Sequence, residues 1–142
     1  MRCRKRLPGQ SMQLCISVLR CLGVASWNVG NISIQRVPEL LNYLSRRLGC
    51  VPIVAFQECR HWPADPQLPH HFMYHPEGCK AALALPNRLA KRRGCCLGDG
   101  NTVGVQFGRL AFISSYLPDS SQGVGPYDRA IQAADRVLGG LW

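Results

Sequence analysis

Apolar residues in the first third of the chain form a continuous run and then a periodic stripe. Residues 16–27 are almost continuously apolar and lead into turn-forming residues, which predicts a buried strand that ends near Asn28. Residues 1–15 are rich in basic side chains and are expected to form a flexible lead-in. Farther along, Pro38 suits a first helical turn and Gly49 suits a helix end, which predicts a helix. Its apolar stripe consists of Val37, Leu40, Leu41, Leu44 and Leu48.

A second apolar run, residues 51–56, is short and rich in β-branched side chains, which predicts another buried strand. Strand, helix and strand in this order predict a parallel pair, because parallel strands need a long crossover connection. A right-handed crossover brings the ends of both strands to one edge of the sheet. We therefore expect Asn28 and Glu58, which follow these strands, to lie close together.

The rest of the chain alternates between loops and short strands. Residues 61–78 hold four prolines and four histidines, which predicts a surface loop that contributes little to the core, with a short strand at 72–74. Residues 80–85, 102–107 and 110–116 read as strands, and the last two are close enough for a hairpin. The expected class is α/β: an incomplete α/β sandwich around a central mixed sheet, in which antiparallel strands continue the parallel pair.

A final helix is predicted from an apolar stripe that the adjacent Gly139 and Gly140 are expected to close. The stripe consists of Tyr127, Ile131, Ala134 and Leu138.

Composition narrows the class of partner. The 142 residues suit one domain, and 46% hydrophobic content excludes wholesale disorder. A net charge of +9 favours polyanions, with nucleic acid preferred and acidic membranes as the alternative. No apolar run approaches the roughly 20 residues of a transmembrane helix. Eight cysteines without a repeated C-x-x-C predict free thiols, which favours the cytoplasm or nucleus. Organelle targeting stays open, because no acidic residue precedes Glu39.

Three short motifs lie at the ends of predicted strands and resemble motifs of a known family. They are Ala25-Ser26-Trp27-Asn28-Val29, Ile53-Val54-Ala55-Phe56-Gln57-Glu58 and Ser114-Ser115-Tyr116-Leu117-Pro118. Together they resemble the opening motifs of the endonuclease/exonuclease/phosphatase superfamily, in the form seen in apurinic/apyrimidinic and retrotransposon endonucleases. The resemblance covers roughly residues 19–138 and assigns 16–142 to the N-terminal portion of such a domain. It implies a DNase I-like fold and hydrolysis of phosphodiesters with Mg²⁺ or Mn²⁺, on nucleic acid in preference to phosphoinositides or sphingomyelin.

The resemblance also implies a role for one residue of each string. Phosphodiester hydrolysis requires a cation on the phosphoryl oxygens, a positioned water with its base, and hydrogen-bond donors to the phosphate. Glu58 would anchor the metal, since Mg²⁺ is often held by one or two carboxylates with waters and substrate oxygens. Asn28 would orient the phosphate or the Glu58 carboxylate, and Tyr116 would donate its hydroxyl to a phosphate oxygen.

Two departures from the family pattern modify this picture. Asp119 stands at a substrate-binding position where the third motif usually has asparagine, and its negative charge would repel phosphate. The family's later Asp-x-Asn and Asp-His motifs have no counterpart before Trp142, so we expect the general base to be missing. Asp99-Gly100-Asn101 matches the first in letters only, because it precedes a mid-sheet strand. The alternative function is therefore an inactive remnant that binds nucleic acid through its basic surface.

Two further clusters have alternative interpretations. Arg88, Lys91, Arg92 and Arg93 form a basic cluster that either contacts nucleic-acid phosphates or is a solvated loop. The other cluster contains zinc-ligand types at spacings that fit no closed Cys/His pattern, so a labile loop is the alternative. Its members are Cys59, His61, His70, His71, His75 and Cys79. An incomplete sheet also predicts self-association through an exposed edge.

Overall fold

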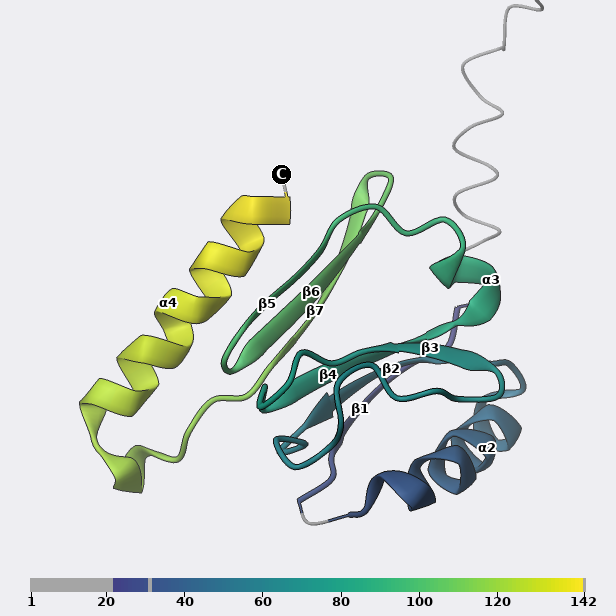
Figure 1. The fold of residues 1–142 in the computed structure, drawn as a ribbon, viewed down its shortest axis with the longest axis horizontal. Coiled ribbons are helices and arrows are strands. Elements are labelled where there is room, and N and C mark those ends of the chain that lie inside the picture. The colour runs from purple at the N-terminus through teal and green to yellow at the C-terminus, as the bar shows by residue number, and fades with distance from the viewer. Residues whose placement is uncertain (1–21, 31, 142) are drawn as a thin grey trace, which may run out of the picture.

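Residues 22–30 and 32–141 are described by a computed structural model, in which two helices enclose two stacked sheets (Figure 1). The predicted lead-in and residues 16–21 of the first predicted strand lie outside these residues. The layers run from helix α2 through a four-stranded and a three-stranded sheet to helix α4. The elements are β1 (Val24–Asn28), η1 (Ile34–Arg36), α2 (Val37–Leu48), β2 (Ile53–Gln57), β3 (His71–Tyr74), β4 (Ala81–Pro86), α3 (Asn87–Ala90), β5 (Cys96–Asp99), β6 (Thr102–Phe107), β7 (Leu110–Ser115), η2 (Ser120–Gln122) and α4 (Val124–Leu141).

The strand–helix–strand unit forms as predicted. Strands β1 and β2 pair in parallel with Asn28 opposite Gln57, so both strands end at the same edge. Helix α2 connects them, with Pro38 in its first turn and Gly49 as a left-handed cap at φ 69°. Glycine adopts that conformation without the steric cost of a Cβ atom. The first sheet is completed by β4 and β3, in the order β1-β2-β4-β3.

The first sheet is mixed, as expected, with β1 and β2 parallel and β4 antiparallel to β2. The expectation that β6 and β7 continue this sheet is wrong, because they belong to a separate antiparallel sheet of order β5-β6-β7. Strand β4 already has β2 on one side and β3 on the other, and β6 lies between β5 and β7. Both strands are therefore already paired on each side and cannot pair with one another, and the two sheets stack face to face. Strand β5, which the sequence pattern did not reveal, fills the last position beside β6.

Two apolar clusters hold the layers together. Between α2 and the first sheet, Val37 and Leu41 pack with Val54 and Phe56. Between the sheets, Leu83 of β4 packs in a cluster that contains buried residues of β6. All six residues of β4 are buried because this central strand is covered on both faces. The small Ala82 and Ala84 belong to the α2 cluster, whereas Ala81, Leu83 and Leu85 belong to the cluster between the sheets.

The histidine- and proline-rich segment contributes to the core, contrary to expectation. Trp62 and Met73 are buried in the α2 cluster, and the Trp62 and Phe56 rings meet edge to face with centroids 5.2 Å apart. His75 is fully buried, with its ring nitrogens 2.9 Å from Pro63 O and 2.8 Å from Cys79 O. Backbone carbonyls satisfy these polar atoms, so a segment without periodicity can still be buried.

Helix α4 buries a different face from the one predicted. Its buried residues are Ala130, Ala133, Val137 and Leu141. Tyr127, Ile131 and Leu138 of the predicted stripe are 42%, 38% and 42% exposed. Apolar residues occur on both faces of this helix, and packing on the sheet selected the face with small residues.

The helix also continues through Gly139 and Gly140 to Leu141, where we expected it to end. A Cβ atom at Gly140 would lie 2.5 Å from Leu97 Cδ1, so this glycine allows the helix to approach β5. On the sheet side, a Cβ atom at Gly104 would lie 2.7 Å from Leu141 Cδ1 and 2.8 Å from Val137 Cγ1.

Strand β1 lies at an edge of the first sheet, and none of the described residues pairs with its outer side. Self-association through such an edge remains a prediction. Among residues 22–30 and 32–141, no helix combines the length and apolar character needed to cross a bilayer.

Replacing Gly104 with alanine tests the close approach of α4. Gly104→Ala should lower the free energy of unfolding by about 1–3 kcal/mol, because the added methyl overpacks against Val137 and Leu141. Gly139→Ala is the control: no atom lies within 4 Å of its Cβ position, so alanine should stabilise the helix by about 0.5–1 kcal/mol. Urea unfolding measures both, and equal effects of the two changes would contradict the packing described.

His71 predicts a pH dependence of stability. The residue is 4% exposed, its Nε2 lies 2.9 Å from Pro52 O, and burial lowers the pKa of its imidazole below 6.5. Near this pH the unfolded chain therefore binds more protons than the folded chain. The contribution of the buried, neutral His71 to stability is complete above pH 6.5 and is lost as the pH falls through the lower folded pKa. Between pH 7.5 and 5, the free energy of unfolding should fall less in His71→Gln than in the wild type. An identical dependence of this free energy on pH in both proteins would contradict the prediction.

Candidate functional site

Asn28 and Glu58 meet at the shared end of β1 and β2. Asn28 Nδ2 donates a hydrogen bond of 2.9 Å to Glu58 Oε1. The backbone N–H of Gly30 donates to Asn28 Oδ1 at 3.1 Å, which fixes the orientation of the amide group. The amide therefore directs its donor toward the carboxylate. The parallel register that pairs Asn28 with Gln57 creates this contact.

Glu58 has an unusual backbone conformation. Its φ is 62°, in the left-handed region, which costs a non-glycine residue roughly 1–2 kcal/mol. Hydrogen bonds hold the backbone on both sides: Val29 N–H donates to Gln57 O at 3.0 Å, and Cys59 N–H donates to Lys80 O at 3.3 Å. Strain of this kind is often found at functional sites. Here it occurs at the residue that carries the carboxylate.

Glu58 opens into a cavity of about 350 Å³, which we call the Glu58 cavity. Its lining residues are Gly30, Glu58, Arg60, His61, Lys80 and Tyr116. Lys80 and Tyr116 are held by the turn after β5, since their N–H groups donate to Gly100 O and Asn101 O at 2.8 Å. Lys80 Nζ lies 5.1 Å from the centroid of the Tyr116 ring, a cation–π contact.

Polar side chains of β2 and β7 tie the two sheets together. Ser114 Oγ donates to Phe56 O at 2.9 Å, and Gln57 Nε2 donates to Ser114 Oγ at 3.2 Å. Ser26 Oγ donates to Gln57 Oε1 at 3.3 Å, which extends the network to β1. These bonds fix the end of β7 beside β2. Tyr116 is thereby held on the same cavity as Glu58.

The His61 ring has a defined tautomer in its neutral form. Its Nε2 lies 2.9 Å from Ile32 O, and Trp62 Nε1 donates to the same carbonyl oxygen at 2.8 Å. A carbonyl oxygen only accepts, so His61 Nε2 carries the hydrogen and Nδ1 retains its lone pair.

The basic cluster of the sequence lies at the opposite end of the sheet from Glu58. Strand β4 pairs Ala81 with Gln57 at one end and Pro86 with His71 at the other. The five residue steps between them span roughly 17 Å. Arg88 belongs to α3, which follows β4, and Lys91, Arg92 and Arg93 come directly after this helix. Arg93 donates from Nη1 to Ala90 O at 2.7 Å and stacks on the Phe72 ring at 4.1 Å.

Asp119 and Asp99 have structural contacts of their own. Asp119 Oδ1 accepts from the Ser121 N–H at 3.0 Å, so the carboxylate caps the turn η2. Asp99 Oδ2 lies 2.5 Å from Arg136 Nε of α4, in an ion pair that is partly exposed. The Asp99-Gly100-Asn101 turn still touches the site, because its backbone carbonyls hold Lys80 and Tyr116.

Within the described residues, the histidines and cysteines of the predicted zinc cluster do not assemble into a metal site. In the described part of the chain, no three His, Cys, Asp or Glu side chains are grouped to hold a metal ion. Burial raises the pKa of Cys59 to about 12 and also raises that of Cys79. The thiols are therefore protonated and pack as small apolar groups. The described cysteines, Cys50, Cys59, Cys79, Cys95 and Cys96, are all free, as expected.

Comparison with known proteins adds no assignment: no family model, curated protein or solved structure matches the chain.

The structure adds two cations that sequence reasoning did not assign to the site, Arg60 and Lys80. Arg60 is two residues beyond Glu58, and Lys80 immediately precedes β4, whose first residue pairs with Gln57. The rule that strand ends at one edge converge could have identified Arg60. Lys80 required knowledge that β4 is antiparallel to β2.

Paired substitutions at Glu58 test the backbone strain. Glu58→Gly and Glu58→Ala both remove the bond from Asn28, but only glycine tolerates φ 62° without steric cost. Glu58→Gly should therefore unfold with a free energy about 1 kcal/mol higher than Glu58→Ala. At Arg60, which has no positive φ, the same pair should show the opposite order. Chemical denaturation distinguishes these results, and a less stable Glu58→Gly would contradict the strain.

Proposed function

We propose that the Glu58 cavity is the site of a Mg²⁺-dependent phosphodiester hydrolase that acts on nucleic acid. The observation that carries the proposal is the 2.9 Å bond between Asn28 Nδ2 and Glu58 Oε1, a residue that lines a cavity together with Lys80 and Tyr116. The resemblance of the three strings to the endonuclease/exonuclease/phosphatase superfamily, and to retrotransposon endonucleases within it, supports the same reaction.

The charges around the cavity favour an anionic substrate. Arg60 and Lys80 contribute two positive charges against the single carboxylate of Glu58. A phosphodiester carries one negative charge per linkage, which this excess of positive charge complements. Tyr116 provides a hydroxyl group that donates to phosphate oxygens. Charge alone also suits phospholipid headgroups, and the basic composition of the whole chain favours nucleic acid.

The residues fit a divalent cation that is shared with a substrate phosphate. Asn28 occupies one oxygen of Glu58 and leaves Oε2 for a metal ion. Mg²⁺ is commonly held by one or two carboxylates together with waters and substrate oxygens, so one glutamate is enough. When bound, such an ion offsets the charge that develops on the phosphoryl oxygens. Mn²⁺ suits the same oxygen ligands.

Hydrolysis also needs a base for the attacking water, which the sequence analysis expected to be missing. His61 lines the cavity, and its Nδ1 retains a lone pair because Nε2 donates to Ile32 O. In the proposed step this nitrogen takes a proton from water while the water oxygen bonds to phosphorus. The bond from phosphorus to the leaving oxygen breaks, and a solvent proton neutralises that oxygen.

A second candidate function is binding of nucleic acid without hydrolysis. It is favoured by one observation: of the described residues that line the cavity, Glu58 alone carries a carboxylate. A site that holds a cation only through one carboxylate and the substrate is less well organised for turnover. Phosphate binding by Arg60 and Lys80 does not require the cation.

Plasmid nicking tests the proposed reaction. The purified chain should nick supercoiled DNA with Mg²⁺ and lose this activity in chelator. Glu58→Gln should lower the rate at least roughly 100-fold, the scale on which one electrostatic group acts at such a site. His61→Ala should lower it roughly 100-fold if this imidazole is the base. Glu39→Gln, on the exposed first turn of α2, removes a carboxylate away from the cavity and should nick at the wild-type rate.

The outcomes separate the two candidate functions. Nicking that persists in Glu58→Gln or in chelator would exclude the proposed site. DNA binding that weakens with salt, without nicking by any form of the chain, would establish the second function.

A further inference from the structure

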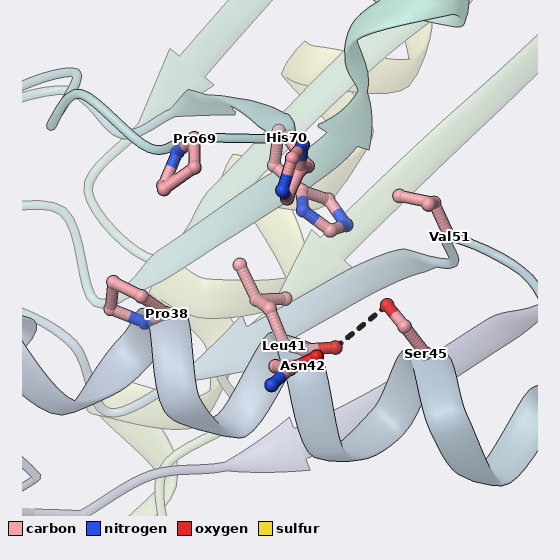
Figure 2. Close-up of a pocket in the computed structure, with 8 residues that line it drawn as sticks. Pro38, Leu41, Asn42, Ser45, Val51, Pro69 and His70 are labelled. Atoms are coloured by element: carbon pink, nitrogen blue, oxygen red, sulfur yellow. Dashed lines mark hydrogen bonds between the residues drawn. The ribbon is translucent and has the colours of Figure 1, made fainter.

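A second hollow lies at the end of the first sheet opposite Glu58. This cavity, which we call the α2 pocket, has a volume of about 470 Å³ and lies between α2 and the segment that leads into β3. Figure 2 shows Pro38, Leu41, Asn42 and Ser45 of α2 on one side, and Pro69 and His70 across from them. Val51 and His71 complete the lining. The volume lies in the range of ligand-binding pockets, and apolar walls with a few polar groups are typical of them.

His71 gives the α2 pocket a hydrogen-bond acceptor of fixed orientation. Its Nε2 donates to Pro52 O at 2.9 Å, because a carbonyl oxygen only accepts, and Nδ1 therefore retains the lone pair. Burial lowers the pKa of this imidazole, so the ring is neutral at pH 7. Asn42 is exposed at the same pocket and can both donate and accept. These groups can pair with a planar polar edge, and Pro38, Leu41 and Pro69 offer apolar surface to the faces of a ring.

The α2 pocket continues into a groove that leads to the basic cluster. A neighbouring hollow of about 370 Å³ shares Val51 and His70 with it and reaches Pro86, Asn87 and Arg88. The segment before β3 is linked to the start of α3, since the Asn87 N–H donates to His70 O at 3.1 Å. Lys91 and Arg92 follow α3 and are exposed. An apolar pocket with polar edges thus leads toward side chains that attract phosphate.

We propose that this end of the sheet is a second nucleic-acid site, in which the α2 pocket takes one unpaired nucleobase and Lys91 and Arg92 bind the adjoining backbone phosphates. A nucleobase is neutral and planar, and it carries donors and acceptors along one edge, as His71 and Asn42 require. A base inside a duplex is stacked and paired, so the ligand is single-stranded. An acidic lipid surface would use the cations and leave the imidazole and amide edge without a partner.

Binding of a fluorescent oligothymidylate in chelator tests the proposal, because no cleavage occurs under that condition. The matched probe is an abasic strand of the same length and charge. The wild-type chain should bind the abasic strand at least about fivefold more weakly, the lower end of the contribution of one docked base. These measurements do not depend on hydrolysis, so failure of the nicking assay leaves them intact.

Two pairs of variants locate the binding site. Asn42→Ala combined with His70→Ala should reduce the preference for the strand with bases, because both side chains line the α2 pocket, whereas Tyr43→Ala, in a different hollow of α2, should retain it. Lys91→Gln with Arg92→Gln should weaken the binding of both strands. It should also reduce the slope of the logarithm of the binding constant against that of salt concentration by roughly 1.4, the value for two single-strand phosphate contacts. Arg109→Gln with Arg129→Gln removes the same charge elsewhere and should change neither preference nor salt slope.

Three results would overturn the proposal. One is equal binding of the strands with and without bases by the wild type. Another is an unchanged base preference in the Asn42→Ala, His70→Ala variant. The third is competition by anionic phosphatidylserine vesicles that displaces the oligonucleotide from the wild type but not from Lys91→Gln with Arg92→Gln, which would assign the surface to a membrane.

Discussion

The parallel pairing of β1 with β2 is the constraint from which the site follows. It places Asn28 opposite Gln57, so the next residue, Glu58, turns away from the sheet beside the asparagine amide. A shift of one residue would reverse the faces of every side chain in β1. Ala25 and Trp27 of β1 pack against the α2 cluster, and such a shift would remove them from it. Burial of the strand and geometry of the site are therefore consequences of the same register.

Stacking of the two sheets completes the cavity. Lys80 immediately precedes β4 and Tyr116 immediately follows β7, so the cavity is lined from both sheets. The apolar cluster between the sheets sets their separation, and the bonds of Ser114 to Phe56 O and Gln57 set their alignment. The left-handed backbone of Glu58 is held by this framework on both sides. A stable core and a strained residue at its edge are combined at this site.

The two ends of the first sheet differ in chemistry. At the end of β2, polar groups and cations surround one carboxylate and suit a phosphate. At the other end, prolines, Leu41 and a neutral imidazole form a larger and more apolar pocket that continues toward α3. The length of β4 keeps these surfaces about one strand apart. Two groups of basic residues, Arg60 with Lys80 and Arg88 with Lys91 and Arg92, thus have different neighbours.

The sequence by itself determined the local units: the helix between Pro38 and Gly49, the parallel strands on either side of it, and the meeting of Asn28 with Glu58. These follow from short-range periodicity and from the handedness of one crossover. Only the tertiary structure decided which strands share a sheet, which face of α4 is buried, and that Lys80 joins the site. Those outcomes depend on strand edges already occupied by distant segments and on the space that glycines leave between layers. A local sequence pattern contains no information about either of these.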